Sequence, residues 1–170
     1  MANKMVYCCF DANTEGDIPV NNDIKYFNLF KAWKNNPNID FDFFNVHEEY
    51  KIPKKYLEED NEAKIKEYLT KRLDITQVFV VIVGEHTANL FKYVRWEIAK
   101  ALEKNIPIVA INISGENGRD DKYCPAIIRD ELVLHVPFDL EKIKTAISIW
   151  PQNYKSLKSQ GVKGQRILKQ

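Results

Sequence analysis

Short apolar runs and longer amphipathic segments alternate along this chain, and residues 78–102 contain the clearest pair. Residues 78–83, VFVVIV, form an unbroken β-branched and aromatic run, which is typical of a strand buried on both faces. After a polar turn, the spacing of apolar residues becomes helical over 91–102. A buried strand that leads into a helix places the turn between them at the carboxyl edge of a parallel sheet, where α/β proteins bind their ligands.

The same alternation recurs in the rest of the sequence. Further strands are predicted at 5–10, 39–46, 106–113 and 132–136, and further helices at 24–33, 63–74 and 139–149. Asp139 is the expected N-cap of the last helix, and Pro151 is expected to lie just past its end. This order predicts an α/β fold, a flavodoxin-like three-layer sandwich with a parallel sheet of about five strands and the first and third at its centre. Residues 1–150 are expected to form this domain, and 151–170 a basic tail.

Composition narrows the class of protein further. The net charge of +1 over 170 residues gives no indication of a nucleic-acid surface. Cys8 and Cys9 are adjacent in a predicted strand and should point to opposite faces, so they are expected to be core residues rather than a disulfide. The sequence has no signal-peptide pattern and no apolar run of bilayer-spanning length, which predicts a cytoplasmic protein without a membrane segment.

Several familiar active sites are missing from the sequence. Its six glycines form neither a phosphate-binding loop nor a dinucleotide fingerprint. Gly84 occupies the position at which a phospho-receiver domain needs an aspartate. No nucleophile elbow is present, and His47, His86 and His135 are too scattered for a zinc site, so no metal is expected.

One acid remains as a candidate. Glu97 lies beside the apolar stripe of the helix after the third strand, with Tyr93 one turn earlier. Phe10 and Asp11 end the first strand and His47 ends the second, which brings them to the same carboxyl edge. A lone helical glutamate is more often a surface charge, and the other residues are more often packing or loop groups. The spacing alone leaves both interpretations open.

The string VGEHTANLFKYVRWEIAKAL, together with strand ends CFDA and FNVH, resembles the bacterial TIR-like domains of Thoeris antiphage defence, over residues 4–150. The resemblance implies that Glu97 is the catalytic acid and that Tyr93 is the aromatic residue before it, where many relatives have tryptophan. It also implies cleavage of NAD between nicotinamide and ribose. NAD is then the substrate, no cofactor is needed, and an ADP-ribose derivative, often cyclic, activates a separate effector.

Under this interpretation one glutamate suffices, because nicotinamide leaves as a neutral base and positive charge develops on the ribose. The remaining predicted substrate contacts are aromatic surfaces and hydrogen-bonding groups: Phe10, Tyr93, Asp11, Asn45, His47 and Thr87. The expected partners are NAD, a phage-derived trigger and the effector, and self-association is left open. Two alternatives are a non-catalytic TIR-like adaptor and a nucleoside deoxyribosyl transferase.

Overall fold

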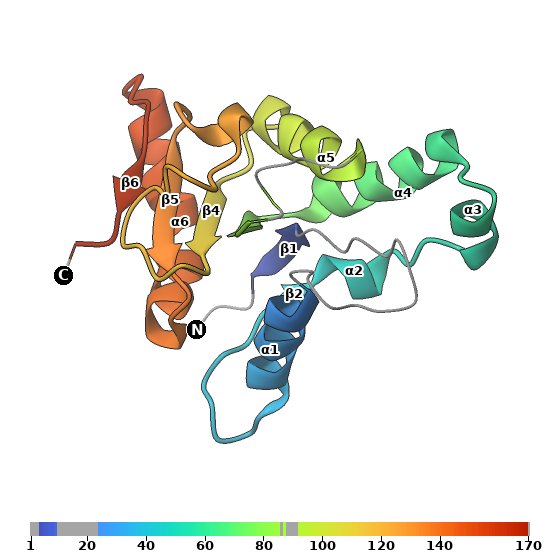
Figure 1. Cartoon of the computed structure of the whole chain (residues 1–170), viewed down its shortest axis with the longest axis horizontal. Coiled ribbons are helices and arrows are strands. Elements are labelled where there is room, and N and C mark those ends of the chain that lie inside the picture. Colours follow the sequence, from blue (N-terminus) through green and yellow to red (C-terminus); the bar gives the residue numbers. More distant parts are fainter. Residues whose placement is uncertain (1–3, 10–23, 86, 88–91, 170) are drawn as a thin grey trace.

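The computed structural model of the chain describes residues 4–9, 24–85, 87 and 92–169. Strands and helices alternate within them, as the apolar pattern predicts (Figure 1). In chain order the elements are β1 (Met5–Cys9), α1 (Ile24–Asn35), β2 (Phe44–Asn45), α2 (Val46–Glu49), α3 (Lys54–Glu58), α4 (Glu62–Ile75), β3 (Val78–Val83), α5 (Lys92–Glu103), β4 (Ile108–Asn112), the 3₁₀ turn η1 (Ala126–Ile128), β5 (Val133–Pro137), α6 (Leu140–Ser159) and β6 (Arg166–Ile167).

The strands form one parallel sheet in the order β2-β1-β3-β4-β5-β6. β1 and β3 pair with each other inside the sheet, as predicted, although β3 and β4 are the middle pair of the observed order. Over the described residues the sheet has six strands rather than about five, because residues 166–167 of the tail pair with Leu134 and His135 of β5. The α/β, flavodoxin-like class is confirmed.

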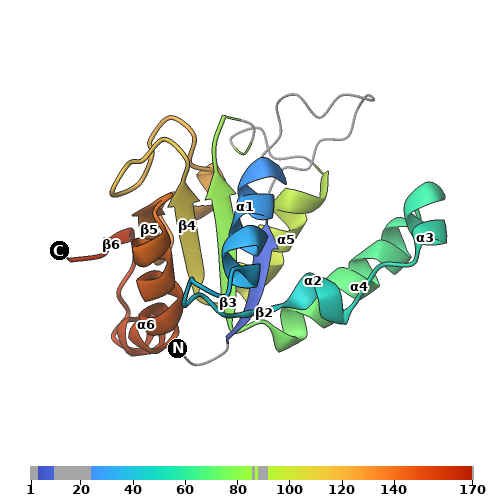
Figure 2. The same ribbon diagram turned by 90° about the horizontal axis from the view of Figure 1, so that it is seen from below.

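Helices cover both faces of the sheet, with α4 and α5 on one side and α1 and α6 on the other (Figures 1 and 2). Successive side chains of a strand point to opposite faces. Cys8 accordingly packs in the cluster under α1 and α6, whereas Cys9 packs in the cluster under α5. Both thiols are free and buried, so the prediction that they are core residues on opposite faces is confirmed.

The second strand is much shorter than predicted. Residues 39–46 were expected to be extended, but only Phe44 and Asn45 pair with β1. The strand ends there because the Asn45 side chain accepts a hydrogen bond from the backbone N–H of His47 at 3.1 Å and caps α2. The charged segment after β2 forms the short helices α2 and α3.

The last helix begins as predicted and ends later. Asp139 caps it by accepting a hydrogen bond from the backbone N–H of Lys142 at 3.0 Å. The helix then continues through Pro151 to Ser159, so its predicted end at residue 149 is wrong. Trp150 and Tyr154 are only 2% and 5% exposed, and we infer that their burial outweighs the hydrogen bond that proline cannot donate.

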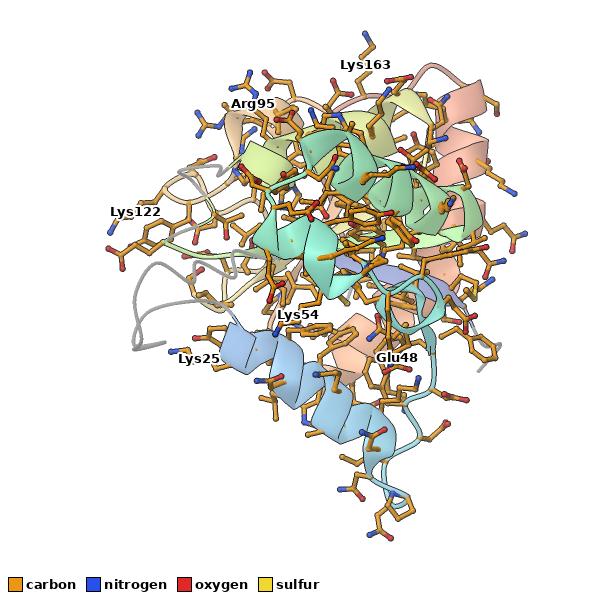
Figure 3. All side chains as sticks on the ribbon, turned by 90° about the vertical axis from the view of Figure 1, so that its right-hand side faces the viewer. Lys25, Glu48, Lys54, Arg95, Lys122 and Lys163 are labelled. Atoms are coloured by element: carbon orange, nitrogen blue, oxygen red, sulfur yellow. The ribbon has the colours of Figure 1, made fainter. Side chains whose placement is uncertain are left out.

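Charged side chains project outward from the helices, as Figure 3 shows for Lys54 and Arg95. None of the described helices combines the length and the apolar composition that a membrane-spanning segment requires.

Candidate functional site

Glu97, the acid singled out by the sequence, is buried in α5. The side chains of Val94, Ile98 and Ala101 on this helix are buried in the core. Glu97 lies three residues after Val94 and four before Ala101, which places it on the same stripe. Its exposed fraction is 8%. The glutamate is therefore not the solvated surface charge that a lone acid on a helix usually represents.

Both carboxylate oxygens of Glu97 accept hydrogen bonds from β1. The Tyr7 hydroxyl donates to Oε1, and the Cys9 thiol donates to Oε2 with the sulfur 3.4 Å away. Tyr7 and Cys9 can reach the same acid because side chains two residues apart on a strand share one face. Cys9 is the last residue of β1, so the carboxylate lies near the carboxyl end of an interior strand.

Burial and hydrogen bonding act in opposite directions on this acid. Burial raises the pKa of Glu97, whereas the hydrogen bonds from Tyr7 and Cys9 and the charge of Arg72 lower it, with a net rise. Burial and the charge of Glu97 raise the pKa values of the Tyr7 phenol and the Cys9 thiol well above their usual ranges. Both groups therefore keep their protons and act as donors at neutral pH. A carboxylate held in this way interacts more strongly with a nearby cation than one in water.

His47 lies beside this cluster as the second residue of α2. Its ring centroid is 4.8 Å from that of Tyr7, and its Nε2 is 2.9 Å from the carbonyl oxygen of Cys8. Arg72 of α4 approaches the other ring nitrogen, Nδ1, at 3.1 Å. Burial and the charge of Arg72 lower the pKa of His47 to about 4, so the ring is neutral at physiological pH. His47 of α2 is thus hydrogen-bonded through both ring nitrogens, and its contact with a substrate stays a prediction.

Two other predicted residues shape the chain near the same edge. Asn45 is buried at the end of β2, where it caps α2. Thr87 is buried after β3: its hydroxyl donates to the carbonyl of Ile82 at 2.7 Å and accepts from the backbone N–H of Gly84 at 3.1 Å. These bonds fix the end of β2 and the turn after β3. Contact of either side chain with a substrate stays a prediction.

Tyr93 lies half-buried near the start of α5, and its hydroxyl donates to Asp60 at 3.2 Å. This bond ties α5 to the loop between α3 and α4. Phe10 and Asp11, the predicted end of the first strand, lie outside the described residues. Their place in the site, like that of Tyr93, stays a prediction.

Three residues of the cluster were not singled out by the sequence interpretation: Tyr7, Cys9 and Arg72. Tyr7 and Cys9 look like ordinary core residues in an apolar strand, and only their shared face hints at a common contact. Arg72 carried a clearer signal. It follows Ile65 and Leu69 at positions i+7 and i+3, so a charged residue falls on the buried stripe of α4, where it is 7% exposed.

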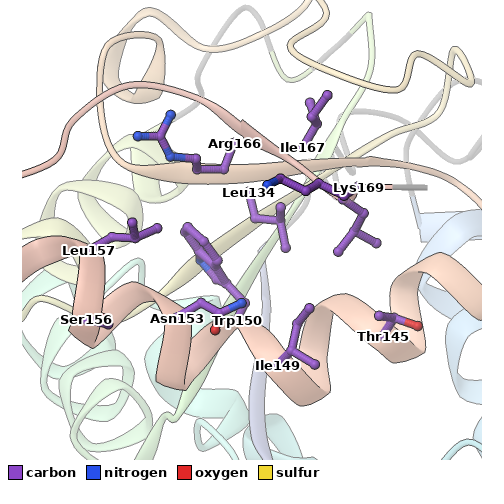
Figure 4. Close-up of a pocket in the computed structure, with 11 residues that line it drawn as sticks. Leu134, Thr145, Ile149, Trp150, Asn153, Ser156, Leu157, Arg166, Ile167 and Lys169 are labelled. Atoms are coloured by element: carbon purple, nitrogen blue, oxygen red, sulfur yellow. The ribbon is translucent and has the colours of Figure 1, made fainter.

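A cavity of about 490 Å³ lies elsewhere, between α6 and strands β5 and β6 (Figure 4). Leu134, Trp150 and Ile167 are among its walls, and Glu97 is not. A substrate pocket next to Glu97 therefore stays a prediction. Within the described part of the chain, no three His, Cys, Asp or Glu residues are grouped so that they could hold a metal ion.

Comparison with known proteins gives one clear relationship. Residues 7–118 match the family described as Thoeris protein ThsB, TIR-like domain. The matched segment contains Tyr7, Cys9, His47, Arg72 and Glu97, and it ends before α6 and β6. No curated protein matches the chain. The match covers well over half of the sequence, so the chain belongs to the Thoeris ThsB TIR-like domain family and has a TIR-like role in antiphage defence.

Proposed function

We propose that this protein cleaves NAD at the bond between nicotinamide and ribose, with Glu97 as the catalytic carboxylate. The observation that carries the proposal is the burial of this acid at the carboxyl end of β1, with donors from the strand on both oxygens. The family gives the reaction class its plausibility, because a TIR-like domain is consistent with chemistry on NAD.

The reaction needs charge stabilisation more than proton transfer. When the N-glycosidic bond breaks, its electron pair moves to the pyridinium nitrogen, and nicotinamide leaves as a neutral base. The ribose C1′ is left as an oxocarbenium ion. An ionised Glu97 beside that carbon stabilises the developing cation, and the low dielectric of a buried site strengthens the attraction. No second carboxylate is required.

Tyr7 and Cys9 support this role by donating to Glu97. Their hydrogen bonds favour the ionised form of the acid, which the reaction requires, against the desolvation that opposes it. They also fix the direction of the carboxylate, so that little reorganisation is needed as charge develops. Contacts of Phe10, Asp11 and Tyr93 with the nicotinamide or ribose remain part of the proposal.

The fate of the oxocarbenium ion determines the product. Attack by water releases a proton and gives linear ADP-ribose. Attack by the adenine or a ribose hydroxyl of the same molecule gives a cyclic product. Within Thoeris defence, we propose that a phage-derived trigger starts this reaction and that a separate effector senses the product.

The test compares Glu97→Gln with the wild type and with Glu103→Gln. Glu103 ends the same helix, but it is exposed and paired with Lys100 at 2.7 Å, which makes it a matched control. The proteins are incubated with NAD, with and without lysate from phage-infected cells, and nicotinamide is measured by chromatography. Glu97→Gln should lower its release roughly 100- to 1,000-fold, as removal of one transition-state stabiliser does elsewhere. The thermal midpoint should be retained.

A non-catalytic TIR-like adaptor is the second candidate. It is favoured by the same two hydrogen bonds, because an acid that only ties α5 to β1 would make them too. In that case neither the wild type nor Glu97→Gln would release nicotinamide, with or without the lysate. The substitution would chiefly change the free energy of unfolding. Equal nicotinamide release by wild type and Glu97→Gln would refute the catalytic role of this acid.

A further inference from the structure

Arg72 is a buried cation without a carboxylate among its described hydrogen-bond partners. It lies on the inner stripe of α4 and is 7% exposed. Its Nε donates to the backbone carbonyl of Tyr50 at 2.8 Å, and its Nη1 lies 3.1 Å from Nδ1 of His47. A buried guanidinium is costly unless its donors and its charge are used. The position of this residue therefore calls for an explanation beyond helix packing.

The contact with Arg72 fixes the protonation state of His47. A guanidinium has only donors, so Nδ1 of the imidazole must be the acceptor. The ring proton then resides on Nε2, which donates to the carbonyl oxygen of Cys8 at 2.9 Å. Both ring nitrogens are used, and the ring is held as one neutral tautomer between α4 and the carboxyl end of β1.

The imidazole of His47 packs against the phenol ring of Tyr7, whose hydroxyl is hydrogen-bonded to Glu97. The ring centroids of His47 and Tyr7 are 4.8 Å apart, with an angle of 55° between the rings. Tyr7 also stacks on Phe79, with centroids 5.0 Å apart. The phenol thus packs against two rings, and its hydroxyl donates to Oε1 of Glu97. A chain of direct contacts runs from Arg72 through His47 and Tyr7 to the acid.

We propose that Arg72 is a positioning residue for Glu97: through its contact with His47 it orients Tyr7, and its buried positive charge favours the ionised form of the carboxylate. The inference rests on the proposed NAD cleavage and adds a residue on a different helix, which acts without touching the substrate. It explains the buried acid on α5 and the buried cation on α4 by one shared role.

Among the residues that the structure describes, the groups that act on the pKa of Glu97 can be named. β1 contributes Tyr7 and Cys9, both of which stay protonated, and α4 contributes Arg72. Of these groups, Arg72 alone carries a charge at neutral pH. Its removal should therefore raise the pKa of Glu97, because burial would then be opposed only by two neutral donors.

The test uses Arg72→Met, which removes the charge and the hydrogen bonds, and Arg72→Lys, which keeps the charge but loses the fork that reaches two acceptors at once. Arg95→Met, at an exposed site on α5, is the control. The first readout is kcat/KM for NAD against pH. The second is the pH titration of the Glu97 side-chain carboxyl by carbon NMR, with that signal assigned by its absence in Glu97→Gln.

Arg72→Met should move the acidic limb and the Glu97 titration to higher pH, because the positive charge that lowers the pKa of Glu97 is lost. Arg72→Lys should leave the titration near that of the wild type and lower kcat, because His47 is no longer held. Arg95→Met should change neither. An unchanged Glu97 titration in Arg72→Met overturns the inference even if NAD cleavage is established.

The role of Arg72 can still be decided if the wild type is inactive or if Arg72→Met does not fold. If the wild type does not cleave NAD, the proposed function fails, and the NMR titration alone still decides the role of Arg72. If Arg72→Met does not fold, Arg72→Lys decides it. In Arg72→Lys, a Glu97 titration displaced from that of the wild type would overturn the proposal. So would an unchanged kcat together with unchanged NMR chemical shifts of the His47 ring nitrogens.

Discussion

Replacing Tyr7 by phenylalanine tests whether the Glu97 carboxylate is held as the structure indicates. Tyr7 is fully buried, and the substitution removes one hydroxyl and one hydrogen bond to the acid. A hydrogen bond to a charged group contributes about 1.5–3 kcal/mol to stability, against about 1 kcal/mol between neutral groups. At pH 8 we expect a loss of about 2 kcal/mol, which for a domain of this size lowers the thermal midpoint by roughly 4–8 °C.

The penalty should depend on pH in a defined direction. The folded-state pKa of Glu97 is raised above 4.5, so its contribution to stability is present below the unfolded value and lost as the pH rises through the folded value. Removal of the Tyr7 donor raises the folded value further. The loss of stability in Tyr7→Phe should therefore be larger at pH 8 than at pH 5, where more of the acid is protonated and the lost bond is between neutral groups.

The assay is thermal and urea unfolding of four proteins: wild type, Tyr7→Phe, Glu97→Gln and the double variant. The double-mutant cycle isolates the Tyr7–Glu97 coupling. Tyr154→Phe is the control, because this tyrosine is also buried and the described hydrogen bonds include none from its hydroxyl. A coupling near zero, or a penalty that is the same at both pH values, would refute the reasoning.

Two further predictions concern the pH dependence and the last helix. As the pH falls, kcat/KM for NAD should decrease with a midpoint above 4.5, the ordinary value for glutamate, because a protonated Glu97 cannot stabilise a cation; a midpoint at or below that value would assign the limb to another acid. Pro151→Ala should restore a backbone donor inside α6 and raise the free energy of unfolding by about 1–2 kcal/mol, after the entropy gained by the unfolded chain is subtracted. Differential scanning calorimetry would measure it, and a lower thermal midpoint would mean that Trp150 and Tyr154 need the bend to pack.

Apolar periodicity predicted the fold well where burial dominates. The run at 78–83 became β3 with the predicted bounds, because a strand covered on both faces has few polar positions to blur the pattern. Apolar periodicity predicted the wrong bounds where local polar contacts or tertiary packing determine where a strand or helix ends. The Asn45 side chain caps α2, which ends β2 earlier than the pattern predicts. We infer that the burial of Trp150 lets α6 continue through Pro151.

The candidate site was predictable only in part, for a related reason. The spacing of apolar residues made Glu97 a candidate, but its proposed role came from the resemblance to TIR-like domains. Its hydrogen-bond donors, Tyr7 and Cys9, lie about ninety residues away along the chain, and spacing carries no information on such contacts. Arg72 could have been found by the rule that picked out Glu97, since it too is a charge on an apolar stripe.

Stability alone gives a poor account of these two charges. A buried acid and a buried cation both lose hydration, and apolar side chains of similar volume are often as stable or more so. Arg72 reaches Glu97 only through His47 and Tyr7, so the two do not form the close pair that best offsets desolvation. Departures from apolar patterning in an otherwise regular core are expected where function requires them. The proposed reaction supplies such a requirement. Glu97 would stabilise the oxocarbenium ion of the ribose, and Arg72 would favour the ionised form of this acid.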